Sequence, residues 1–132
     1  QGEEVILVDT IGELVGCYEL ATCVFVGRSL KPPGGGQNMM EPAALGKPVI
    51  VGRYTGNFEP EMALLRDEKA ILEVQNAEDL WRRCHRLLSD PAFAEALGYR
   101  ARAAVLRSQG ATGRTLHRLE SLLEHNGLTG SK

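Results

Sequence analysis

The chain has 132 residues, 43% apolar and 24% charged, which suits one domain with a buried core and is too short for two. Fifteen lysines and arginines against seventeen aspartates and glutamates give a net charge of −2, which argues against a nucleic-acid partner bound through bulk positive charge. No apolar run approaches the ~18 residues of a membrane span, and the three cysteines lack the spacing of a disulfide framework or a zinc site.

Four short apolar segments rich in valine and isoleucine predict β-strands. They are Val5 to Val8, Cys23 to Val26, Pro48 to Val51 and Ala70 to Val74. The first three are nearly continuous apolar runs, as expected for strands of a parallel sheet that is covered on both faces. Helical patterns lie between the strands, so the order β-α-β-α-β-α-β predicts an α/β fold with right-handed crossovers.

Three helices are predicted between these strands. The first begins at Thr10, where Glu13 completes a capping-box pattern, and the second runs from about Met39 to Leu45. A third helix begins near Asn57.

After the last strand the pattern is purely helical. Asn76 is the expected cap of one helix, and Asp90-Pro91 is typical of the start of the next. A final helix is expected near Thr112 to Glu124. Residues 1–125 are therefore expected to form one domain, and residues 126–132 a flexible tail.

Glycine-rich polar segments follow the first three strands. They are Asp9 to Glu13, Gly27 to Asn38 and Gly52 to Asn57. In a parallel α/β sheet these segments lie together outside the carboxyl ends of the strands, where such sheets bind ligands. Three successive glycines, Gly34 to Gly36, leave backbone N–H groups unshielded just before a helix, which favours a phosphate. The alternative is a flexible loop that only connects two elements.

Asn38 and Glu41 allow two interpretations. Their spacing matches a capping box, in which each residue satisfies a backbone group of the other. Alternatively, the Glu41 carboxylate accepts hydrogen bonds from two vicinal ribose hydroxyls, which match a carboxylate well. The residues alone leave both interpretations open.

Several segments resemble motifs of the bacterial 3-deoxy-D-manno-octulosonic acid (Kdo) transferases. Asp9 to Leu14 is similar to their D-T-[MI]-G-E-L motif, and Phe25 to Leu30 to their F-V-G-G-S-L segment. Gly35 to Val49 resembles their G-G-[HQ]-N-x-x-E-P-A-A-x-G-x-P-V segment, and Asn57-Phe58 the N-F after the next strand. Together these matches cover roughly residues 5 to 65 in the right order, and the combination is specific.

The resemblance implies a GT-B glycosyltransferase, in which two Rossmann-like domains face each other across a cleft. The parent protein would transfer Kdo from the donor CMP-Kdo to a lipid A precursor in lipopolysaccharide biosynthesis. This chain would be part of the C-terminal donor-binding domain, a Rossmann-like parallel sheet with flanking helices that ends in a helical segment. The N-terminal acceptor domain, which supplies the catalytic carboxylate, would be missing, so we expect the fragment alone to be inactive.

The resemblance also implies which residues bind the donor. They are Thr10, Ile11, Gly12, Glu13, Ser29, Gly35, Gly36, Gln37, Asn38 and Glu41. The Gly35 to Asn38 loop would hold the donor phosphate or the sugar carboxylate, and Glu41 the ribose hydroxyls. Thr10 to Glu13 would contact the nucleotide or the sugar acid, and Ser29 would line the same cleft. No catalytic residue, metal or cofactor is expected in this chain.

The chain departs from the motifs in its cations. Arg28 stands where the second glycine of the F-V-G-G segment is expected, and the stretch from Lys31 to Gly34 is one residue longer than in many relatives. Arg28, Lys31 and Arg53 either attract an anionic donor or are simply solvated.

Two alternative functions remain open at this stage. The same fold could use another nucleotide-sugar, such as a UDP-sugar, or the chain could be a non-catalytic module that binds a nucleotide or a partner domain. We expect a cytoplasmic protein, with its parent associated with the cytoplasmic face of the inner membrane. The first residue is Gln1 rather than methionine, which favours a piece of a longer protein.

Overall fold

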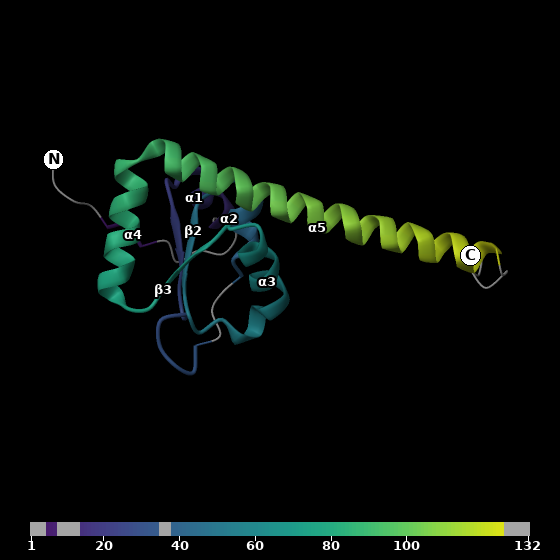
Figure 1. Ribbon diagram of the computed structural model, residues 1–132, viewed down its shortest axis with the longest axis horizontal. Helices are drawn as coiled ribbons and strands as arrows, with labels where there is room; N and C mark the ends of the chain where they lie inside the picture. The colour runs from purple at the N-terminus through teal and green to yellow at the C-terminus, as the bar shows by residue number, and fades with distance from the viewer. Residues whose placement is uncertain (1–4, 8–13, 35–37, 126–132) are drawn as a thin grey trace.

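A three-stranded parallel sheet forms the centre of the molecule (Figure 1). The computed structural model describes residues 5–7, 14–34 and 38–125, without the side chains of residues 15 and 110–125. The strands are β1 (Val24–Val26), β2 (Val49–Gly52) and β3 (Leu72–Val74), in the order β1-β2-β3. Val24 pairs with Val49 and Ile50 with Leu72, so β2 is the central strand.

Helices precede, connect and follow the strands. They are α1 (Leu14–Leu20), α2 (Met40–Ala44), α3 (Glu59–Asp67), α4 (Ala77–Ser89) and α5 (Pro91–His125), with a 3-10 turn, η1 (Gly56–Phe58), before α3. The expected α/β architecture of a Rossmann-like parallel sheet with flanking helices and a helical C-terminal segment is therefore confirmed.

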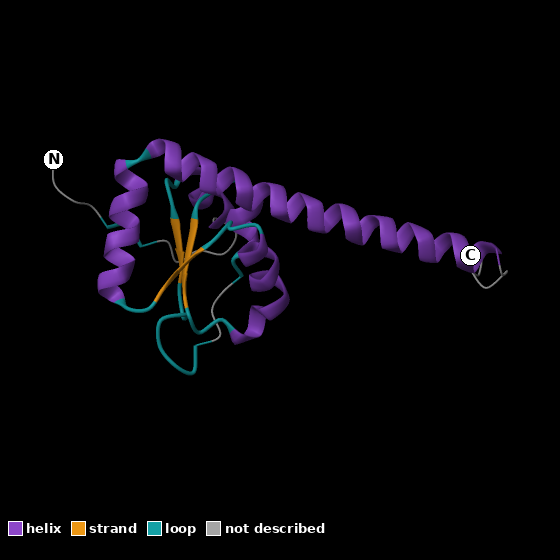
Figure 2. Cartoon of the chain, in the orientation of Figure 1, coloured by secondary structure: helices purple, strands orange, loops and turns teal. Residues whose placement is uncertain are grey.

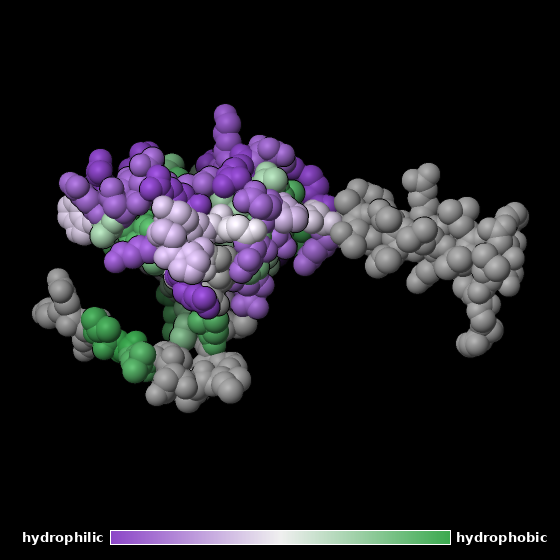
Figure 3. All heavy atoms as spheres, turned by 90° about the horizontal axis from the view of Figure 1, so that it is seen from below, coloured by the Kyte–Doolittle hydropathy of each residue, from purple (hydrophilic) through white to green (hydrophobic). Residues whose placement is uncertain are grey.

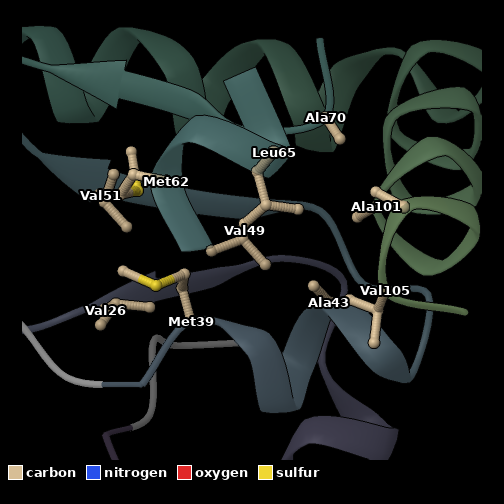
Figure 4. Packing of buried hydrophobic residues seen from close by; sticks show 11 residues of the cluster. Val26, Met39, Ala43, Val49, Val51, Met62, Leu65, Ala70, Ala101 and Val105 are labelled. Carbon is tan, nitrogen blue, oxygen red and sulfur yellow. The ribbon is translucent and has the colours of Figure 1, made fainter. Parts of the chain in front are cut away.

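Both faces of the sheet are buried, which explains why its central strand is an uninterrupted apolar run. All four residues of β2 are buried, and its side chains alternate between the two faces. Val49 and Val51 pack with Met62 and Leu65 of α3 on one face, together with residues of α2 and α5 (Figure 4). Ile50 belongs to a second cluster on the other face, formed with Val74, Leu87, Ala94 and Leu97.

The caps predicted after the third strand are present. The Asn76 side chain accepts a 2.8 Å hydrogen bond from the backbone N–H of Asp79 at the start of α4. Asp90 accepts a 3.1 Å hydrogen bond from the backbone N–H of Phe93, and Pro91 is the first residue of α5.

The predicted strand from Val5 to Val8 is not part of the sheet. Val5, Ile6 and Leu7 have no regular secondary structure and are 97%, 78% and 84% exposed. In Figure 3 this apolar segment, drawn green between grey neighbours, stands clear of the globular body. An apolar run indicates that a segment favours burial, whereas a strand also needs a neighbouring strand, and β1 pairs only with β2 among the described residues. Val8 lies outside those residues.

Other differences concern the ends of helices. α1 is described from Leu14, whereas its predicted start at Thr10 lies outside the described residues. α5 is one continuous helix to His125, not two helices, and its distal half extends beyond the body in Figure 1. Its interior glycines disfavour a helix by about 1 kcal/mol each relative to alanine, but this penalty does not by itself end a helix. None of the helices in the described ranges is long and apolar enough to cross a membrane.

Two of the three free cysteines, Cys23 before β1 and Cys84 in α4, pack beside the second core cluster. Both are half-buried. Burial, together with the neighbouring Cys84 thiol, raises the pKa of the Cys23 thiol from 9.0 to about 11. The folded protein therefore holds this proton more tightly than the unfolded chain does.

We expect Cys23 to react slowly with iodoacetamide, because only the thiolate is nucleophilic. The alkylation rate of the Cys23 peptide, measured by mass spectrometry, should still rise about tenfold per pH unit between about pH 8 and 10. The contribution of the protonated Cys23 thiol to the free energy of unfolding should be complete below about pH 9 and decrease as the pH rises toward the pKa of the folded state. A rate that levels off near pH 9 would contradict the shift.

Candidate functional site

Ser29 joins the loops that follow β1 and β2 at the carboxyl edge of the sheet, the lower edge in Figure 2. Its hydroxyl donates a 2.7 Å hydrogen bond to the Val26 carbonyl and accepts a 2.8 Å bond from the Gly52 N–H. The Ser29 carbonyl accepts a third bond, 2.9 Å long, from the Tyr54 N–H. Ser29 is 0% exposed, so its hydroxyl is used inside the protein instead of lining a cleft as expected.

Two glycines allow these loops to come so close together. A Cβ on Gly52 would lie 2.0 Å from the Ser29 carbonyl oxygen. A Cβ on Gly34 would lie 2.3 Å from the Cβ of Tyr54, and Gly34 also has a φ of +68°, which favours glycine. The first of the three successive glycines is therefore required by packing against the next loop.

The start of α2 presents Asn38 and Glu41 to solvent. The Asn38 side chain accepts a 2.9 Å hydrogen bond from the N–H of Met40, the first residue of α2, whereas Met39, the residue directly before the helix, makes no side-chain cap. Among the described residues, Asn38 and Glu41 do not exchange hydrogen bonds, so the capping box is not formed. The Glu41 side chain is therefore available to a ligand.

Tyr18 lies near Glu41. Partial burial raises the pKa of the Tyr18 hydroxyl, and the negative charge of Glu41 raises it further. The sequence pattern did not mark Tyr18 as a site residue. Its place beside Glu41 depends on how α1 packs against α2, which no local pattern reports.

Helix α2 is shorter than expected and contributes little as a dipole. It spans five residues, Met40–Ala44, rather than the seven predicted. The macrodipole arises from aligned peptide units, so a single turn adds less than a full helix does. Attraction of an anion to this edge must therefore come mainly from backbone N–H groups and from nearby cationic side chains.

Cationic side chains are present on the loops of this edge. Arg28 and Lys31 line a hollow of about 200 Å³ together with Pro32, Pro33 and Gly34. The Arg53 guanidinium lies over the Tyr54 ring, 5.3 Å from its centroid. Arg28 has a φ of 61°, which explains why a glycine suits this position.

The remaining predicted site residues cannot be placed. Thr10, Ile11, Gly12 and Glu13 lie outside the described residues, as do Gly35, Gly36 and Gln37. Within the described part of the chain, no group of three histidine, cysteine, aspartate or glutamate side chains is arranged to hold a metal ion.

Comparison with known proteins identifies relatives of the whole chain. No protein-family model matches it. It is 36% identical over 127 residues to the 3-deoxy-D-manno-octulosonic acid transferase of Haemophilus influenzae, covering 96% of this chain and 30% of the relative. It is 38% identical over 120 residues to the same enzyme of Bordetella pertussis, covering 91% of this chain and 28% of the relative.

The fold is also similar to a solved structure. The crystal structure of the C-terminal CMP-Kdo binding domain of WaaA from Acinetobacter baumannii matches with a TM-score of 0.69 and 37% identity. The match covers 74% of this chain and 51% of that one. This chain is homologous to the C-terminal part of the Kdo transferases. It spans about 30% of the length of the two Kdo transferases described above.

The relation to the Kdo transferases confirms two expectations from the sequence. The quoted motifs indicated this family, and the relatives belong to it. The fold class, part of a GT-B C-terminal domain, agrees with the WaaA domain that the structure matches.

Proposed function

We propose that this chain binds the nucleotide-sugar donor CMP-Kdo. In the complete protein it would form the donor-binding part of a glycosyltransferase that transfers Kdo to a lipid A precursor in lipopolysaccharide biosynthesis. One observation carries this proposal: the chain shares 37% identity and the fold of a domain whose structure is described as CMP-Kdo binding. Because function depends on the site and not on the fold alone, the proposal also requires donor-binding groups at the carboxyl edge of the sheet.

The geometry of the carboxyl edge supports the proposal. Glu41 is exposed at the start of α2, where its carboxylate can accept hydrogen bonds from the two hydroxyls of a ribose. Asn38 orients the first turn of the same helix through its bond to Met40. Arg28 and Lys31 place positive charge on the preceding loop, which suits the phosphate of a nucleotide.

In the proposed reaction, this chain binds and orients the donor. The bond between the anomeric carbon of Kdo and the phosphate oxygen breaks, and the acceptor hydroxyl oxygen forms a new bond to that carbon. The acceptor proton passes to the catalytic carboxylate of the N-terminal domain, and CMP leaves with the bonding electron pair. Hydrogen-bond donors and cations at the carboxyl edge stabilise the negative charge that develops on CMP. Binding also holds the anomeric carbon of Kdo in line with the acceptor oxygen.

The same proposal assigns the partners of the chain. Residues 1–125 would act as one nucleotide-sugar-binding domain that faces an N-terminal acceptor domain in the parent protein. Because the acceptor is a lipid A precursor, the parent would work at the cytoplasmic face of the inner membrane. The chain by itself is expected to bind the donor nucleotide without catalysing transfer.

Calorimetric titration with CMP and UMP tests the proposal. We expect the chain to bind CMP more tightly than UMP, and Glu41→Gln to weaken CMP binding by about tenfold, because a charge-assisted hydrogen bond contributes about 1.5 kcal/mol or more. The same substitution should weaken binding of 2′-deoxy-CMP by less, because this nucleotide lacks one of the two hydroxyls that Glu41 would accept.

A matched control is Glu95→Gln, which neutralises an exposed glutamate of α5 at the opposite edge of the sheet. It should leave CMP binding unchanged. Equal loss of CMP and 2′-deoxy-CMP affinity in Glu41→Gln would refute the ribose role of Glu41. Tighter binding of UMP than of CMP would favour a UDP-sugar donor instead.

A further inference from the structure

Two described residues other than glycine adopt the left-handed backbone region: Arg28, with a φ of 61°, and Lys69, with a φ of 54°. An L-residue disfavours this region because its Cβ approaches the following carbonyl oxygen, whereas glycine does not. Lys69 follows the end of α3, and its N–H donates a 2.9 Å hydrogen bond to the Arg66 carbonyl, which is an ordinary helix-ending turn. Arg28 is not at a helix end, so its conformation has another cause.

The loop itself imposes the conformation of Arg28. Its neighbour Ser29 is buried and is tied to Val26 and Gly52 by the two hydrogen bonds of its hydroxyl. The chain must reverse direction between these anchors, and Arg28 occupies the reversal. A glycine would meet this backbone requirement without strain, so the side chain at this position needs an explanation outside the fold of the loop.

The surroundings of Arg28 supply that explanation. Arg28 and Lys31 line the 200 Å³ hollow, and its other walls are Pro32, Pro33 and Gly34, so no acidic side chain faces the two cations from the lining. Neither cation forms an ion pair with a described carboxylate, in contrast to Arg66 and Arg107. Packing of Gly34 against Tyr54 holds the far wall in place. The result is a positively charged hollow at the carboxyl edge.

We infer that the hollow is an oxyanion subsite in which Arg28 and Lys31 hold a phosphate or carboxylate group of the sugar nucleotide. The inference rests on the proposed function and adds to it a group-specific contact on the loop after β1. A planar guanidinium can donate two parallel hydrogen bonds to such a group, and Lys31 adds a second positive charge. The same residues would help to stabilise CMP as it leaves.

The experiment compares Arg28→Gly with Lys69→Gly. Both substitutions remove one exposed cation and place glycine at a position with a left-handed backbone. However, Lys69 lies at the amino edge of the sheet, just before β3 begins. Both variants should keep or raise the melting temperature, by up to about 4 °C. Only Arg28→Gly should lower the affinity for CMP or for free Kdo, by about tenfold, as expected for the loss of a charged hydrogen-bonding partner.

Calorimetry with CMP and with free Kdo distinguishes the two sources of the oxyanion. A loss confined to CMP assigns the hollow to phosphate, and a loss confined to Kdo assigns it to the carboxylate. Unchanged affinity of Arg28→Gly for both compounds overturns the subsite, although CMP binding by the original chain would still support the proposed function.

A titration with inorganic phosphate, followed by the NMR signal of the Arg28 side-chain N–H, tests the subsite independently of the nucleotide. A shift that saturates in the original chain and in Lys69→Gly supports the subsite, even if CMP does not bind and the proposed function fails. A signal that phosphate leaves unchanged overturns it.

Discussion

Replacing Gly98 with alanine is expected to lower the free energy of unfolding by about 3 kcal/mol. Helix propensity alone predicts the opposite, because alanine stabilises a helix interior by about 1 kcal/mol relative to glycine. However, Gly98 is the point where α5 contacts the turn after α2, and a Cβ there would lie 2.1 Å from the Gly46 carbonyl oxygen. A backbone atom cannot move aside cheaply, so the two elements would have to separate.

Gly16→Ala is the matched control, since Gly16 lies inside α1 and a Cβ there would meet nothing within 4 Å. This substitution should raise the free energy of unfolding by about 0.5 to 1 kcal/mol. Urea unfolding followed by circular dichroism measures both changes. Similar small gains in the two variants would show that α5 and the Gly46 turn do not pack as closely as described.

Replacing Ser29 with alanine is expected to destabilise the protein by about 2 to 4 kcal/mol. The substitution removes both hydrogen bonds of a hydroxyl that is 0% exposed. It leaves the Gly52 N–H buried without that partner, which costs about 1 to 3 kcal/mol in desolvation, in addition to the lost bond to Val26. Urea unfolding with circular dichroism measures the loss, and calorimetry with CMP should detect an affinity change only through weakened loop structure.

Ser108→Ala provides the comparison for Ser29. Ser108 is a half-buried serine of α5 whose hydroxyl forms no hydrogen bond with the described residues, and its loss should change stability by less than about 0.5 kcal/mol. If Ser29→Ala kept full stability but bound CMP weakly, Ser29 would be a ligand contact, as the motif suggested, rather than a structural link.

A match to a sequence motif does not say what each residue of the motif does. Asn76 has the capping role that its position in the sequence predicted, because capping depends on neighbours two or three residues away. Ser29 belongs to an equally recognisable segment, yet its partner Gly52 is 23 residues distant. A motif reports that such a serine is required, but not whether a ligand or the protein requires it.

Local patterns in the sequence determined the α/β class, the core strands after Cys23, the caps at Asn76 and Asp90, and the resemblance to the Kdo transferases. Each of these depends on periodicity, capping or motif spacing within a short stretch of chain. Only the tertiary structure decided that Val5 to Leu7 stay outside the sheet and that α5 is a single helix. Only it decided that Ser29 faces inward and that Arg28 and Lys31 share one hollow. The physical reason is that strand pairing, burial and the approach of two loops depend on residues far apart in the sequence, which no local pattern contains.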